Sequence, residues 1–159
     1  MKRLLRLSII LLSPVFSAMA DNDIVTLVAN NQADLAMQSI ARGGDVNAPQ
    51  ADGTTALMYA AYLGDAELVA ALVSAGAETN VSNDYGSSAI LEASITGATD
   101  VLEILLAHGA DANWRNPEGE TPLMNVARAG QLQAAELLLA NGAQVDAIEQ
   151  RGGQTALLW

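Results

Sequence analysis

Residues 53–76 read GTTALMYAAYLGDAELVAALVSAG, and the same pattern returns at residues 86–109 and again at 119–142. The period of about 33 residues is that of a repeat protein built from one copied supersecondary unit. Stacked units of this kind form an extended surface, which favours binding over catalysis. Three rows keep the period: Gly43, Gly76, Gly109 and Gly142; Asn31, Gly64, Gly97 and Gly130; and Asn47, Asn80, Asn113 and Asp146.

Each copy predicts two short helices and a turn. In the stretch 53–76, Thr55 is a good N-cap for a first helix and Gly64 favours its left-handed end. A second helix begins near Asp65, with acidic residues at its positive end. The residues between one copy and the next are polar and turn-rich, and we expect a β-turn or hairpin there. The predicted buried stripe of the second helix is Leu68, Val69, Leu72 and Val73.

These features resemble the ankyrin repeat. The residues that carry the resemblance are, in order, Thr121-Pro122-Leu123, Gly130, the segment Glu-Leu-Leu-Leu at 136–139, and Gly142. The resemblance covers residue 21 to the end and implies an all-α solenoid of stacked helix-turn-helix units with short hairpin connections. The His that follows Leu in the family motif is replaced, so we expect weaker fastening between repeats. The replacing residues are Met58, Leu91, Met124 and Leu158.

The repeat boundaries follow from the period. Residues 21–49 form a degenerate N-terminal cap repeat, residues 50–82, 83–115 and 116–148 are full repeats, and residues 149–159 are an incomplete one. One extra residue, Gly152 or Gly153, predicts a longer last hairpin. No second helix or polar cap follows it, so we expect a fragment of a longer array, with Trp159 as a core residue.

Residues 1–20 have the pattern of a secretory signal peptide. Lys2, Arg3 and Arg6 precede a short apolar run, and Ala18-Met19-Ala20 fits a cleavage site before Asp21. The run is short for a membrane span, which takes about 20 residues, although an uncleaved anchor is the alternative. We expect an exported protein, periplasmic or alternatively secreted.

The charge and composition of the chain restrict the classes of partner that it can bind. The chain has eighteen acidic and seven basic residues, and all the acids lie at or after Asp21. Such a body repels phosphate backbones and anionic lipid, which disfavours nucleic acid and membrane partners, and it fits either solubility or a basic partner. The chain has no Cys, which excludes disulfides and thiol chemistry. We expect a monomer.

No catalytic pattern stands out. The one His, His108, lies at a helix end, where a surface cation is commoner than a ligand. The acids recur with the repeat, no EF-hand loop is present, and nucleophile-elbow and P-loop spacings are absent. Asn80-Val81-Ser82 matches a glycosylation sequon, but the repeated turn explains Asn80 better. We expect no enzyme activity, no cofactor and no metal site, with weak Ca²⁺ binding left open.

The resemblance implies a binding surface of hairpin tips and the concave face of the first helices. Aromatic and Arg residues dominate interface energies, so Tyr62, Tyr85 and Arg128 rank high. Trp114 is either an anchor or a residue that covers the adjacent hairpin. We expect a protein-interaction module outside the cytoplasm; the alternatives are the N-terminal region of a longer protein with a catalytic or membrane domain, and a secreted effector that binds host proteins. The candidate residues are Asp52, Tyr62, Asp84, Tyr85, Trp114, Arg115, Glu118 and Arg128.

Overall fold

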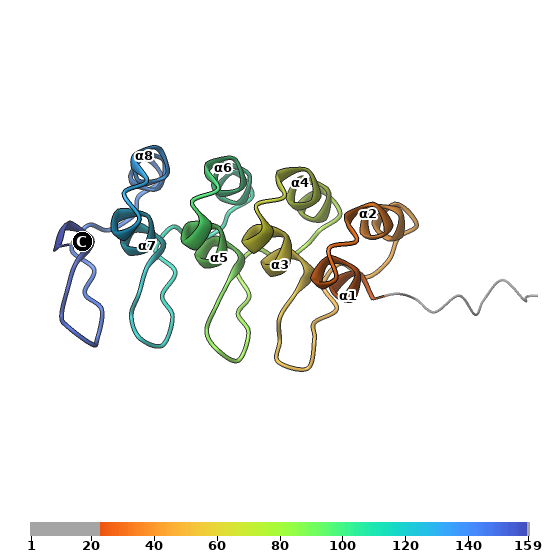
Figure 1. Cartoon of the computed structure of the whole chain (residues 1–159), viewed down its shortest axis with the longest axis horizontal. Helices are drawn as coiled ribbons and strands as arrows, with labels where there is room; N and C mark the ends of the chain where they lie inside the picture. Colours follow the sequence, from red (N-terminus) through yellow and green to blue (C-terminus); the bar gives the residue numbers. More distant parts are fainter. Residues whose placement is uncertain (1–22, 159) are drawn as a thin grey trace, which may run out of the picture.

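The computed structural model describes residues 23–158, so the predicted signal peptide (1–20) and Trp159 lie outside the described residues. Successive helices alternate between an inner and an outer layer. The hairpin loops project from the inner layer, on the side away from the outer layer (Figure 1). The inner layer holds α1 (Ile24–Ala29), α3 (Ala56–Leu63), α5 (Ala89–Thr96) and α7 (Pro122–Arg128), and the outer layer holds α2 (Ala33–Ala41), α4 (Ala66–Ser74), α6 (Thr99–Ala107) and α8 (Leu132–Ala140).

Local sequence explains where the helices begin and end. The Thr55 hydroxyl accepts a hydrogen bond from the Met58 amide, and Thr121 does the same for Met124 at the start of α7. Gly64 follows α3 with φ of 71°, a left-handed conformation that favours Gly. The predicted caps at Thr55 and Gly64 are confirmed. Ser88, at the equivalent position before α5, makes no capping bond, and its buried hydroxyl has no hydrogen-bond partner within the described structure.

One continuous apolar core runs between the helix layers. The predicted stripe of α4 is buried, and small Ala residues on the inner helices let neighbouring units approach closely. Each predicted unit from residue 21 to 148 contains one helix pair, and residues 149–159 contain a short 3₁₀ helix, η1 (Ala156–Leu158). The residues that replace the family His are buried in the full repeats: Met58, Leu91 and Met124.

A ladder of Asn side chains joins successive repeats. The Asn47 amide nitrogen donates to the Gly76 carbonyl at 3.0 Å, and its oxygen accepts from the Glu78 backbone N–H at 2.9 Å. Asn80 and Asn113 repeat both bonds one and two units further along. The row seen in the sequence is therefore a row of junction bonds, and Asn80 of the sequon uses its side-chain amide in it.

The hairpins are also bonded to one another. The Asp84 N–H donates to the Asp52 carbonyl, and the Gln150 N–H donates to the Glu118 carbonyl, both at 2.8 Å. At the junction between these two, the equivalent donor position is Pro117, which has no N–H. The backbone bond between neighbouring hairpins is therefore present at these two junctions and missing at the junction that contains Pro117.

The last hairpin is longer, as the extra Gly predicts. Its closing bond runs from the Glu149 N–H to the Gln154 carbonyl, whereas the preceding hairpin closes from Asn116 to Glu120. The Glu149 carboxylate accepts from the backbone N–H groups of Arg151, Gly152 and Gln154. Asn116 satisfies only two N–H groups in its own hairpin. A longer, charged side chain thus accommodates the additional residue.

Candidate functional site

The exposed side of the inner helices carries large apolar side chains. Tyr62 and Leu63 end α3 and are 52% and 47% exposed, and Ile95 near the end of α5 is 51% exposed. Tyr62, Ile95 and Arg128 occupy equivalent positions in three successive repeats. Because α5 packs beside both α3 and α7, these side chains form one row, which we call the inner-helix surface together with Leu63.

Side-chain bonds brace the inner helices α3, α5 and α7 against their own hairpins. The Tyr59 hydroxyl donates to the Gln50 side-chain oxygen at 3.0 Å, and the Ser87 hydroxyl donates to the Glu92 carboxylate. In the next repeat, Arg128 pairs with Glu120 at 3.5 Å. These braces fix the angle between helix and hairpin, so the surface is held in shape before any partner arrives.

Arg128 is positioned by a hydrogen-bond chain that starts in the core. The buried Ser94 hydroxyl donates to the Leu91 carbonyl and accepts from the Asn125 side-chain amide. The Asn125 oxygen in turn accepts from Arg128 at 2.8 Å. The guanidinium is therefore held in one orientation at the edge of the surface, as recognition of a carboxylate requires.

The hairpin tips differ in how free their side chains are. Tyr85 is 71% exposed and Asp84 beside it is exposed. The Asp52 carboxylate accepts from the Thr54 backbone N–H, which lowers the pKa of Asp52 below its ordinary value. Glu118 is half-buried, and its carbonyl takes part in the bond to Gln150. Tyr85 and Asp84 are thus the tip side chains most open to a partner.

Trp114 and Arg115 lie on the stem of a hairpin. Trp114 is half-buried against the core and donates from its indole nitrogen to the Gly86 carbonyl. It covers the adjacent hairpin, one of the two roles expected for it. Arg115 is exposed and donates to the Gln144 side-chain oxygen in the following repeat.

The predicted residues therefore fall into three groups. Tyr62 and Arg128 lie on the inner-helix surface, Trp114 and Arg115 on a hairpin stem, and the others at tips: Asp52, Asp84, Tyr85 and Glu118. Sequence reasoning missed the braces. The signal for the first two was a polar residue on the helix at the repeat period, Tyr59 and Glu92; the equivalent Asn125 bonds instead to Arg128, which forms the third brace.

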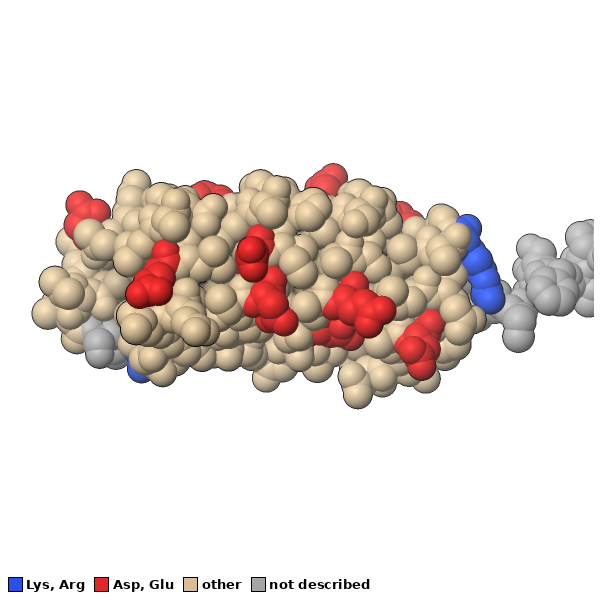
Figure 2. Space-filling view, turned by 90° about the horizontal axis from the view of Figure 1, so that it is seen from above, with Lys and Arg blue, Asp and Glu red and all other residues tan. Residues whose placement is uncertain are grey.

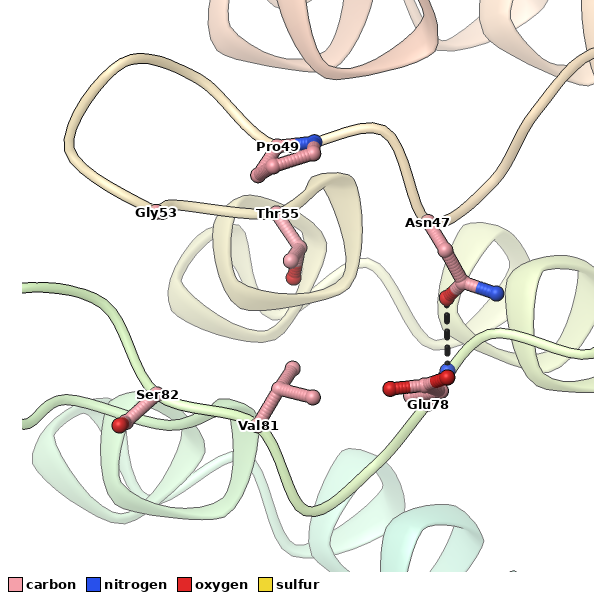
Figure 3. Close-up of a pocket in the computed structure, with 7 residues that line it drawn as sticks. All are labelled: Asn47, Pro49, Gly53, Thr55, Glu78, Val81 and Ser82. Carbon is pink, nitrogen blue, oxygen red and sulfur yellow. Dashed lines mark hydrogen bonds between the residues drawn. The ribbon is translucent and has the colours of Figure 1, made fainter.

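A pocket of about 220 Å³ lies between the first two hairpins, and no residue of the inner-helix surface lines it (Figure 3). Two of its polar side chains are engaged in the fold: the Asn47 oxygen accepts from the Glu78 backbone N–H, and Thr55 caps α3. The remaining lining residues are Pro49, Gly53, Val81 and Ser82. This pocket offers no converging set of reactive groups.

Within residues 23–158, no group of three or more His, Cys, Asp or Glu side chains is arranged to hold a metal ion. None of the helices in that range has the length and apolarity needed to cross a membrane.

Comparison with known proteins identifies the family. A model of ankyrin repeats in three copies matches residues 24–116, and a model of ankyrin repeats in many copies matches residues 105–157. No curated protein matches the chain. The matched ranges contain the helix pairs, the Asn ladder and the inner-helix surface described above. The chain therefore belongs to the ankyrin repeat family, whose repeats are protein–protein interaction modules.

Proposed function

We propose that this protein is a non-enzymatic binding module that acts outside the cytoplasm, in the periplasm. It binds a partner protein through the inner-helix surface and the tip of the hairpin that carries Tyr85. The observation that carries the proposal is the row of half-exposed Tyr62, Leu63 and Ile95 on a braced scaffold. Apolar side chains gathered on an otherwise acidic surface are typical of an interaction site.

The export part of the proposal rests on the signal-like residues 1–20. Amino-terminal sequencing of the protein recovered from the cell envelope tests it. Asp21 as the first residue is the expected result, and retention of Met1 on a cytoplasmic protein contradicts export.

A photo-crosslinking amino acid tests the binding surface. Placed at Tyr62 or Ile95, it should yield the same crosslinked protein in an extract of the cell envelope. The matched control is Leu132, which is 69% exposed on the outer helix α8. Equal crosslinking from all three positions, or from Leu132 alone, would place binding elsewhere.

A further inference from the structure

The apolar residues of the inner-helix surface, Tyr62, Leu63 and Ile95, lie in a part of the chain that has neither Lys nor Arg. This part lies between Arg42 and Arg115. None of the carboxylates in that interval forms an ion pair with a described residue, since the ion pair of the described structure joins Arg128 and Glu120. These carboxylates belong to Asp45, Asp52, Asp65, Glu67, Glu78, Asp84, Glu92, Asp100, Glu103 and Asp111.

Carboxylates flank the apolar row closely. Glu92 lies one helical turn before Ile95 on α5, and Asp65 follows Leu63 by two residues. Asp84 is exposed beside Tyr85 at the hairpin tip. Figure 2 shows that acidic side chains also recur along the face of the outer helices, with basic ones visible only near its two ends. The field over the apolar row is therefore negative, and no Lys or Arg between Arg42 and Arg115 balances it.

Arg128 is the cation of the inner-helix surface, and it is already paired with Glu120. It occupies the position equivalent to Tyr62 and Ile95 in the next repeat, and the Asn125 chain holds it in place. A Lys or Arg of a partner is therefore attracted beside α3 and α5 and gains less beside α7, where the charges of Arg128 and Glu120 offset each other.

We infer that the occupant of the inner-helix surface is a polypeptide segment with apolar side chains at its centre and Lys or Arg flanking them. This inference rests on the proposed function. The apolar side chains cover Tyr62, Leu63 and Ile95, and the basic side chains face Asp65, Asp84 and Glu92. Charge complementarity sets the orientation of the segment and accelerates its approach, while apolar contact supplies most of the affinity.

Selection from a random displayed peptide library against the purified protein tests the inference. The selected pool is expected to be enriched in Lys and Arg around apolar residues. Its binding should fall about ten-fold in Tyr62→Ala and Ile95→Ala, and should be unchanged in the control Leu132→Ala. A neutral or acidic pool, no pool at all, or equal binding to every variant overturns the inference.

Glu92→Gln separates charge from structure. The Gln oxygen still accepts the bond from Ser87, so the brace is kept while the charge is removed. One selected peptide and its analogue with Gln in place of each Lys and Arg are compared by fluorescence anisotropy. Glu92→Gln should weaken binding of the basic peptide several-fold and leave binding of the analogue unchanged. A higher salt concentration should likewise weaken binding of the basic peptide and leave that of the analogue unchanged. Equal effects on both peptides contradict the charge pairing.

The two proposals fail separately. A crosslinked partner at Tyr62 whose bound segment is acidic or neutral leaves the binding function standing and removes only the inferred chemistry. Crosslinking that fails at the surface removes the function itself.

Discussion

The indole nitrogen of Trp114 donates a hydrogen bond to the carbonyl oxygen of Gly86, 3.1 Å away in the preceding repeat. The bond forms at the junction where Pro117 occupies the position that supplies a backbone N–H to the neighbouring hairpin elsewhere. The large ring in a row of small residues thus supplies a junction bond that the backbone does not.

Trp114→Phe keeps an aromatic ring and removes the donor. We expect a loss of about 1 kcal/mol in the free energy of unfolding, measured by urea denaturation. Pro117→Ala restores a backbone donor next to Tyr85, so Trp114→Phe should cost less in that background. Equal costs in the two backgrounds would show that the indole bond and the missing backbone bond are independent.

Asn80→Ala removes both junction bonds between the second and third units. The unfolding free energy should fall by about 1–2 kcal/mol, because the Gly109 carbonyl and the Asp111 N–H each lose a partner. Asn141→Ala is the matched control, since the Asn141 amide bonds only to Leu137 in its own helix. A control loss as large as that of Asn80→Ala would mean that the ladder adds no coupling between repeats.

Gly97 and Gly130 test close packing at equal backbone geometry, with φ of 71° and 70°. A Cβ on Gly97 would meet the Gln131 side chain, which donates to the Thr96 carbonyl, whereas a Cβ on Gly130 meets nothing within 4 Å. Gly97→Ala should therefore lower the melting temperature more than Gly130→Ala. The difference between the two variants in the free energy of unfolding should be about that of one hydrogen bond. Equal shifts would indicate that Gln131 moves aside without loss.

Glu149 gives the last hairpin a dependence on pH. The backbone N–H groups of the hairpin, with the Gln154 contact foremost, lower the pKa of Glu149 below its ordinary value of 4.5. Because the pKa of Glu149 is lower in the folded state, its ionised carboxylate stabilises the fold at pH values above the pKa of the unfolded state. This contribution is lost as the pH falls through the pKa of the folded state. The protection factors for amide hydrogen exchange in residues 149–154, which correct for the intrinsic exchange rate at each pH, should fall over that acidic range, and Glu149→Gln should remove this pH dependence of the protection.

Tyr62→Ala and Tyr85→Ala test exposure directly. Both side chains are more than half exposed, so each change should alter the unfolding free energy by no more than about 0.5 kcal/mol and leave helical circular dichroism intact. Partner binding should weaken. Loss of helicity together with binding would place these rings in the core.

The period of the sequence was enough to predict the helix pairs, the caps at Thr55 and Gly64, and the longer last hairpin, because each depends on local chemistry. The role of Trp114 stayed open because it depends on Gly86 and Pro117 in another hairpin. The braces at Tyr59 and Glu92 were not predicted for the same reason: they join a helix to a hairpin through side-chain geometry. Exposure of Tyr62 and Tyr85 followed from their positions in the repeat.

The Asn ladder has an evolutionary consequence. Each rung spans 29 residues to a carbonyl and 31 to an N–H, so duplicating or deleting a whole block preserves every pairing. Gain of a single codon inside a rung would instead shift its acceptors out of register. The added Gly of the last hairpin falls after Gln144, beyond the final rung of the described residues, where such a gain leaves the pairings intact.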